Sequence, residues 1–277
     1  MTAERDFSGV TVLITGASMG VGAATARAFA GRGANLVLVA RGEEKLNELA
    51  ESLDVGDRAM IASLDVTDTE GFRKLLGRAD EVFGSVDVLV NNAGFHARGP
   101  VESVNAEDLG RMVDVNLKAP IMATRLVLPY LRRSKRPAVI NVASLAGRTP
   151  VPGSATYSAT KFGLRAFGLA LHEEIRDSGI KVASVSPGPI DTGFIMDDID
   201  TVTDLTFSQP LSTAEQVAGA IVELVDDATL DRPMPRISGY LTTVSYLFPK
   251  LGRALRPMLE KKGRKTKQRL KRERGQG

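Results

Sequence analysis

Short apolar runs alternate with longer amphipathic segments along most of the chain. The runs are continuous and rich in Val, Ile and Leu, which is typical of strands buried on both faces of a parallel sheet. Six such strands are expected, at Val10–Thr15, Asn35–Ala40, Arg58–Leu64, Val86–Val90, Ala138–Val142 and Ile180–Val185. Helical periodicity between them predicts helices at Val21–Gly31, Glu43–Leu53, Asp68–Phe83, Ala106–Leu131 and Ser154–Ser178. The fourth helix is expected to bend near Pro120, because proline removes a helical hydrogen bond.

Strands that alternate with helices predict an α/β fold. Right-handed crossovers place helices on both faces, so we expect a single doubly wound, Rossmann-type parallel sheet. No repeat or linker divides the body, and residues 1–239 are predicted to form one domain with Met234–Gly239 as a candidate last strand. A basic C-terminal helical extension follows. Residues 240–260 have an amphipathic helical pattern, and residues 261–277 are expected to be a disordered tail because they have hardly any apolar side chains.

One segment interrupts the alternation. Residues 193–211 are polar and acid-rich, with Asp197, Asp198, Asp200 and Asp204. They follow a Pro/Gly turn after the sixth strand, where an insertion can cover a substrate. We therefore expect a flexible lid, and the alternative is a surface loop without a role.

The composition narrows the available chemistry. Of the 277 residues 43% are hydrophobic and 25% are charged, as in ordinary globular proteins. There is no cysteine, which excludes disulfides and thiolate metal sites. The two histidines, His96 and His172, argue against a histidine metal centre, so no metal is expected. His172 is expected on the surface of a helix, and His96 either lines a site or is a loop residue without a role.

Neither the polar N-terminus nor any apolar run resembles a secretory signal or a membrane span, so a cytoplasmic protein is expected. Charge is nevertheless distributed unevenly. Residues 250–277 carry twelve Lys or Arg and two Asp or Glu, a net charge of +10, although the whole chain has a net charge of +3. The rest of the chain is therefore acidic, with a net charge of −7.

The extension supports two interpretations. Leu247, Leu251, Leu255 and Leu259 recur every four positions among basic residues. This pattern suits an interfacial helix on anionic lipid, which would give peripheral membrane contact through 240–277. The favoured interpretation is a helix packed on the body, or on a second subunit, near the substrate entrance. No specific nucleic acid is expected, because the tail offers phosphate contacts without aromatic stacking residues.

A glycine-rich loop follows the first predicted strand, with the sequence Thr15-Gly16-Ala17-Ser18-Met19-Gly20-Val21-Gly22. Glycines at a strand-to-helix turn let the backbone approach a pyrophosphate closely, and the helix N-terminus supplies amides and a favourable dipole. The position between a strand and a helix is the context that supports dinucleotide binding.

The end of the second predicted strand indicates which dinucleotide is preferred. An acid at this position accepts hydrogen bonds from the ribose 2′-hydroxyl of NAD, whereas an arginine accommodates the 2′-phosphate of NADP. The chain has Ala40-Arg41 and no acid before Glu43. NADP(H) is therefore expected, because guanidinium pairs well with phosphate, and NAD(H) is the alternative.

Tyr157 and Lys161 are one helical turn apart, which places both side chains on one face of a helix. A phenol beside an ammonium can transfer a proton, and the positive charge is expected to lower the pKa of the tyrosine. Ser144 precedes the pair by thirteen positions.

Together these residues resemble the short-chain dehydrogenase/reductase family, over residues 8 to about 230. Besides the glycine loop and the Tyr157/Lys161 pair, the motifs in chain order are Leu64-Asp65-Val66, Asn91-Asn92-Ala93-Gly94, Val115-Asn116-Leu117, Asn141-Val142-Ala143-Ser144 and Pro187-Gly188-Pro189-Ile190-Asp191-Thr192. The resemblance implies that residues 1–239 form a dinucleotide-binding and catalytic domain.

The resemblance also implies roles for individual residues. Tyr157 would be the general acid/base, Lys161 would lower its pKa and hold the nicotinamide ribose, Ser144 would bind the substrate oxygen, and Asn116 would anchor a relay water. The implied cofactor-binding residues are Gly16, Ser18, Met19, Gly20, Val21, Gly22, Arg41, Asp65, Val66, Asn92, Ala93, Gly94, Tyr157, Lys161, Pro187, Gly188, Ile190 and Thr192.

These roles predict an NADP(H)-dependent oxidoreductase that interconverts a ketone or aldehyde and an alcohol. A lipophilic small-molecule substrate is expected from Phe194, Ile195 and Met196 in the lid and from the apolar start of the extension. The alternatives are a 3-oxoacyl-thioester reductase and, in a different class, a catalytically silent dinucleotide-sensing regulatory protein. A homo-oligomer, either dimer or tetramer, is expected; the substrate and the direction of reaction stay open.

Overall fold

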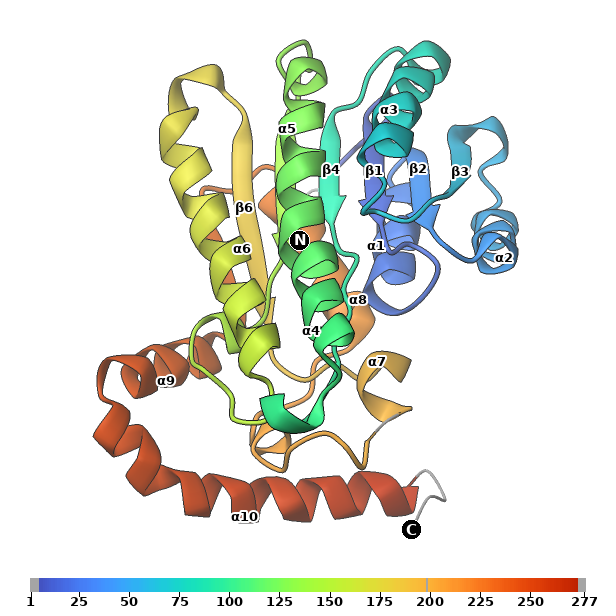
Figure 1. The fold of residues 1–277 in the computed structure, drawn as a ribbon. Coiled ribbons are helices and arrows are strands. Elements are labelled where there is room, and N and C mark those ends of the chain that lie inside the picture. The colour runs from blue at the N-terminus through green and yellow to red at the C-terminus, as the bar shows by residue number, and fades with distance from the viewer. Residues whose placement is uncertain (1–4, 198, 274–277) are drawn as a thin grey trace.

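The computed structural model describes residues 5–197 and 199–273 of the chain. Its centre is a seven-stranded parallel sheet with the strand order β3-β2-β1-β4-β5-β6-β7 (Figure 1). The strands are β1 (Thr11–Thr15), β2 (Asn35–Ala40), β3 (Ala59–Ser63), β4 (Val88–Asn91), β5 (Ala138–Val142), β6 (Lys181–Pro187) and β7 (Asp231–Met234). The predicted doubly wound α/β sheet is confirmed. The strand order reverses between β1 and β4, and a crevice for a ligand forms at the carboxyl ends of such strands.

Helices cover both faces of the sheet. They are α1 (Gly20–Ala30), α2 (Glu43–Leu53), α3 (Thr69–Phe83), α4 (Ala106–Val113), α5 (Ala119–Leu131), α6 (Ala155–Glu174), α7 (Gly193–Met196), α8 (Ala214–Leu224), α9 (Arg236–Leu247) and α10 (Pro249–Glu273). One apolar core joins the sheet to α1, α2 and α8, and a second core joins the opposite face to α3, α5 and α6. None of the helices in the described residues is long and apolar enough to cross a membrane.

The long helix predicted at Ala106–Leu131 is divided by a π-helical turn at Asp114–Lys118, a few residues before the expected bend at Pro120. Pro120 lies in the first turn of α5, where its fixed φ is tolerated. It has no N–H to donate to the carbonyl of Asn116 four residues earlier, so the regular pattern is interrupted before the proline.

The predicted boundaries of the C-terminal region need correction. The last strand ends at Met234, and the residues proposed for its second half begin α9 instead. The tail expected to be disordered from residue 261 continues as α10 through Glu273, and residues 274–277 lie outside the described residues. The composition of the tail was misleading because α10 is held largely by charged and polar contacts with the acid-rich insertion.

The insertion at 193–211 folds around a small apolar core. Ile195, Met196, Ile199, Val202 and Phe207 are buried together, and Leu211 and Leu270 of α10 pack against them. Ion pairs and hydrogen bonds join the same elements, from Arg264 to Asp204 at 3.0 Å, from Lys271 to Asp200 at 2.5 Å, and from Lys267 to the carbonyls of Asp200 and Val202. Asp198 lies outside the described residues. The insertion and α10 therefore support one another.

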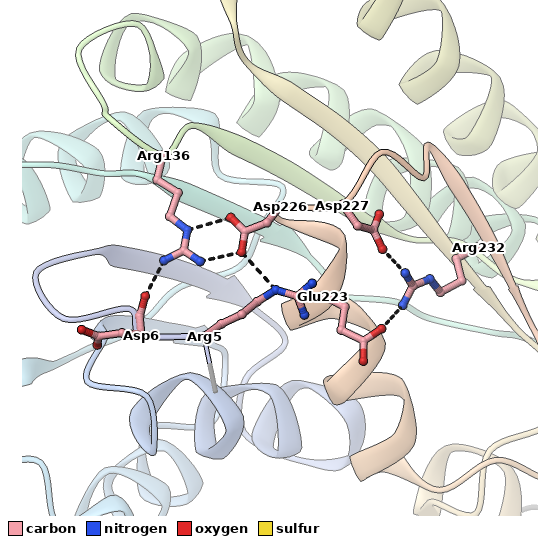
Figure 2. A network of polar contacts seen from close by, with 7 residues as sticks. All are labelled: Arg5, Asp6, Arg136, Glu223, Asp226, Asp227 and Arg232. Atoms are coloured by element: carbon pink, nitrogen blue, oxygen red, sulfur yellow. Dashed lines mark hydrogen bonds and ion pairs between the residues drawn. The ribbon is translucent and has the colours of Figure 1, made fainter. Parts of the chain in front are cut away.

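An ion-pair network lies at the opposite, amino end of the sheet (Figure 2). Arg136, just before β5, donates to the carboxylate of Asp226 after α8 through Nε and Nη2, and Arg5 joins the same carboxylate at 3.3 Å. Arg232 of β7 binds Glu223 at 2.6 Å and also Asp227. These contacts connect the N-terminal segment, α8 and the edge of the sheet, and they leave the carboxyl ends of the strands free for a site.

Candidate active site

A cavity of about 1430 Å³ opens at the carboxyl ends of the strands. It is lined by every residue predicted for the site except Gly22 and Asn116, which lie behind its wall. Segments more than a hundred residues apart in the chain, such as the glycine loop and Tyr157, therefore face one space. No group of three or more His, Cys, Asp or Glu in the described residues is arranged to hold a metal ion.

The glycine loop is shaped for close approach by a ligand. Gly16 and Gly20 have φ values of 65° and 54°, in the left-handed region that favours glycine. A Cβ on Gly22 would lie 2.1 Å from the carbonyl oxygen of Gly16. The first turn of α1 has neither a side-chain cap nor an acidic residue. Its amides and the positive end of the helix dipole are thus available to a phosphate, so the loop fits a dinucleotide pyrophosphate.

Asn92 braces this loop from β4. Its Nδ2 donates to the carbonyls of Thr15 and Gly16 at 2.9 and 3.0 Å. The Thr15 hydroxyl in turn accepts from the amides of Asn92 and Ala93 at 3.0 and 3.1 Å. The side-chain amide of Asn92 is thus already hydrogen-bonded to the backbone of the loop. Asn92 therefore contributes to dinucleotide binding by fixing the shape of the loop. Sequence reasoning missed Thr15; its position at the end of β1, immediately before the first glycine, was the available signal.

Arg41, just after β2, and Lys45 of α2 both line the cavity. The segment after β3 contributes Asp65, whose carboxylate accepts from the amide and hydroxyl of Thr67 at 3.0 and 2.7 Å. The backbone hydrogen bond from Thr67 is the main cause that lowers the pKa of Asp65, and Arg41 adds to the effect. Near the carboxyl ends of β2 and β3, the cavity is therefore lined by two cations and one fixed carboxylate. Lys45 was not predicted from the sequence.

Tyr157 and Lys161 project from the first turns of α6 into the cavity, as their spacing predicted. The Nζ of Lys161 donates to the carbonyl of Val142 at 2.9 Å and lies 5.7 Å from the centre of the Tyr157 ring. Burial lowers the pKa of Lys161 to about 8. Burial also raises the pKa of Tyr157, and its hydrogen bond with Ser144 and the charge of Arg98 oppose this only in part. The expected net lowering of the tyrosine pKa is therefore wrong for this structure.

Ser144 lies at the end of β5, where its hydroxyl accepts from the amide of Ala146 at 3.1 Å and contacts the carbonyl of Pro187 at 3.4 Å. These two contacts hold the hydroxyl, which is also hydrogen-bonded with Tyr157. Asn116 is fully buried, and its side chain exchanges two hydrogen bonds of 2.7 Å with the backbone of Phe95. Its side-chain amide therefore holds the chain segment that carries His96, and its main-chain carbonyl is the group left without an N–H from Pro120.

His96 stacks on the ring of Tyr157, with a centroid separation of 4.0 Å and an interplanar angle of 14°. The Phe194 ring of the insertion lies 6.4 Å from the His96 ring, centroid to centroid. Burial lowers the pKa of His96 to about 3, so the imidazole is neutral. Its Nε2 is buried and has no hydrogen-bond partner in the described residues. His96 therefore lines the site beside the phenol of Tyr157. The sequence did not decide between a site residue and a loop residue without a role, because the contact joins two distant segments.

The buried lysine has a measurable effect on stability. Because the pKa of Lys161 falls from 10.5 to about 8 on folding, the unfolded chain binds more protons between these values. The free energy of unfolding is therefore expected to rise by about 2 kcal/mol between about pH 8 and pH 9.5, and Lys161→Met should lack this rise. Urea unfolding at several pH values measures it. Lys74→Met, at an exposed position on α3, is the control, and equal slopes in all three proteins would contradict the assignment.

Comparison with known proteins agrees with this geometry. Residues 10–202 match the family described as short chain dehydrogenase. The chain is 40% identical over 187 residues to sulfoacetaldehyde reductase 2 of Chromohalobacter salexigens, covering 67% of this chain and 74% of the relative. It is 32% identical over 226 residues to the ketoacyl reductase HetN of Nostoc sp., covering 81% and 78%. A solved short chain dehydrogenase from Mycobacterium paratuberculosis bound to NAD superimposes with a TM-score of 0.77 at 23% identity, covering 85% of this chain and all of the other (100%).

Proposed function

The chain belongs to the short-chain dehydrogenase/reductase family of oxidoreductases, and we propose that it uses NADP(H) to interconvert a lipophilic ketone or aldehyde and its alcohol. The observation that carries this proposal is the convergence of Ser144, Tyr157 and Lys161 on the cavity that the glycine loop also lines. A phenol, a hydroxyl and an ammonium are the groups needed for proton transfer at a carbonyl oxygen.

In the reducing direction, Tyr157 donates its proton to the carbonyl oxygen while Ser144 donates a hydrogen bond to the same oxygen. The dinucleotide, when bound, supplies the hydride that adds to the carbonyl carbon. The raised pKa of Tyr157 keeps the phenol protonated at neutral pH, which suits an acid. Lys161 stabilises the phenolate that remains after transfer, because a positive charge nearby favours the anionic form.

The phenolate must regain a proton before the next turnover. The Nζ of Lys161 lies 5.7 Å from the centre of the Tyr157 ring, and its lowered pKa makes the ammonium a ready donor. We assign to Asn116 the anchoring of a relay water through its main-chain carbonyl, since its side chain is already bound to Phe95. This keeps the predicted role of Asn116 but moves it from the side chain to the backbone.

The glycine loop and the first turn of α1 fit the pyrophosphate, and we assign the adenine end to Asp65 and Val66. We assign the nicotinamide half to residues that line the same cavity as Tyr157, namely Ala93, Gly94, Pro187, Gly188, Ile190 and Thr192. Apolar side chains of the insertion and of α9 line the remaining wall, among them Phe194, Ile195, Leu241 and Val244. They support a lipophilic substrate. The alternative is a 3-oxoacyl-thioester reductase, because the Nostoc relative is named a ketoacyl reductase.

Arg41 carries the proposed preference for NADP(H). It lines the cavity at the end of β2 together with Lys45, so a 2′-phosphate would face two cations. Arg41→Asp is expected to reduce the kcat/KM ratio of NADPH to NADH by about 100-fold or more, because the carboxylate repels the phosphate and accepts from a 2′-hydroxyl. Steady-state rates with both coenzymes measure this change.

Arg78→Asp, on the exposed side of α3, makes the same charge change away from the cavity and should leave the ratio unchanged. A wild-type protein that prefers NADH, or an Arg41→Asp protein with an unchanged ratio, would overturn the assignment.

The proposed activity itself is tested by following NADPH consumption with a panel of ketones of increasing chain length. Turnover that rises with apolar length supports the proposal. NADPH binding without turnover of any carbonyl compound would favour the silent sensor instead.

A further inference from the structure

Most of the large apolar side chains that are exposed in the described residues lie towards the C-terminal end. Among the described residues, ten of the fifteen large apolar side chains that are exposed lie between Ile237 and Met258, on α9 and the first turns of α10. We call this set the apolar elbow; it consists of Ile237, Tyr240, Leu241, Val244, Tyr246, Leu247, Phe248, Leu251, Leu255 and Met258. Such a concentration on one short segment indicates an interaction surface.

The second half of α10 continues this surface with positive charge. Its inner side docks on the insertion, where Gly263 packs against Asp204 so closely that a Cβ would lie 1.7 Å from the carbonyl oxygen. The residues that alternate with the docked ones are exposed. We call them the basic face; they are Lys261, Lys262, Lys265, Arg269 and Arg272. Of these, Arg269 lies 3.7 Å from Glu273.

The elbow also borders the cavity. Leu241, Val244, Leu251, Leu255 and Met258 are exposed and at the same time line the space that contains Tyr157 and Ser144. Figure 1 shows α9 and α10 beyond the carboxyl ends of the strands, with α10 running across that end of the body. The cavity is therefore bordered by an exposed apolar surface.

We propose that the apolar elbow and the basic face dock the protein on an anionic lipid bilayer, and that the substrate enters the cavity from the bilayer. Apolar side chains beside a row of cations are complementary to acyl chains beneath anionic headgroups. A second copy fits less well, because two basic faces brought together by two-fold symmetry would repel one another. The entry of substrate, though not the docking, rests on the proposed function.

The test is cosedimentation of the full chain with vesicles of phosphatidylcholine alone and of phosphatidylcholine mixed with phosphatidylglycerol. The protein is expected to bind the anionic vesicles, and this binding should weaken with added salt. Binding to the neutral vesicles should be weak. The triple variant Lys261→Gln, Lys262→Gln, Lys265→Gln should lose affinity for anionic vesicles by about 100-fold, at roughly fivefold per charge. Leu247→Ser with Phe248→Ser, outside the cavity wall, should release the protein from both kinds of vesicle.

The matched control is Arg73→Gln, Lys74→Gln, Arg78→Gln, which removes three exposed cations from α3 and should bind as the wild type does. Equal vesicle binding by the control and by both test variants would overturn the proposal, as would absence of binding to anionic vesicles. A dimer that the Leu247→Ser, Phe248→Ser variant abolishes would show that a second copy covers the elbow, and would also overturn it. Each variant is assayed with a short water-soluble ketone, and unchanged turnover there separates loss of docking from failure of the proposed reaction.

Discussion

Replacing Tyr157 by phenylalanine is expected to lower kcat for ketone reduction by about 10²- to 10⁴-fold, the range for loss of a positioned general acid. The substitution removes only the hydroxyl, so the ring can still stack on His96 at 4.0 Å and the cavity keeps its shape. NADPH affinity should change by no more than a few-fold, because the substitution does not alter the glycine loop. Fluorescence titration of NADPH and the rate of its consumption measure the two quantities separately.

Tyr130→Phe is the matched control, since Tyr130 lies on α5 outside the cavity wall and its ring is 5.4 Å from the guanidinium of Arg133. It should retain wild-type turnover. If Tyr157→Phe also retained it, the proton would have to come from another group, and the neutral His96 beside the ring would be the first candidate. The pH profile would then follow that group rather than the phenol.

The parts of the candidate site whose placement in the fold agrees with the sequence prediction depend on local spacing. The glycine loop lies directly between β1 and α1, and Tyr157 and Lys161 are one turn apart on α6, so both follow from neighbouring residues. The stack of His96 on Tyr157 and the brace from Asn92 to Thr15 join distant segments. No pattern along the chain specifies them, because they depend on which strand ends meet.

The C-terminal tail shows the same limit more strongly. Its composition favours disorder when it is considered alone, since hardly any of its side chains are apolar. Its order comes from Asp200 and Asp204, which lie 71 and 60 residues from their partners Lys271 and Arg264. The sequence showed both the acidic insertion and the basic tail, but nothing local indicated that they bind each other.

The pKa of Tyr157 could not be predicted from its neighbour in the helix either. The positive charge of Lys161 suggested a lowered pKa, whereas burial is the largest effect and raises it.

The glycine loop allows a second strong prediction, because alanine at Gly22 should disrupt it. Alanine normally stabilises a helix relative to glycine by up to about 1 kcal/mol. Here the new Cβ would lie 2.1 Å from the Gly16 carbonyl oxygen and 2.7 Å from Nδ2 of Asn92, so the loop or its brace must move. Gly22→Ala is expected to weaken NADPH binding by about 100-fold or more and to lower the free energy of unfolding by about 2 kcal/mol, as overpacking does.

Gly77→Ala is the matched control, because a Cβ there meets no atom within 4 Å and the residue lies within α3. It should keep wild-type NADPH affinity and be as stable or slightly more stable. Gly20→Ala is the second test variant if Gly22→Ala does not fold. A Cβ on Gly20 would meet the Thr192 side chain at 3.5 Å, which is an ordinary contact. The φ of 54° at this position would cost alanine about 1 kcal/mol. A folded Gly22→Ala protein with unchanged NADPH affinity would contradict the pyrophosphate assignment. The reason is that Gly22 contacts the loop and not the cavity, so its substitution can affect the coenzyme only by moving the loop that holds it.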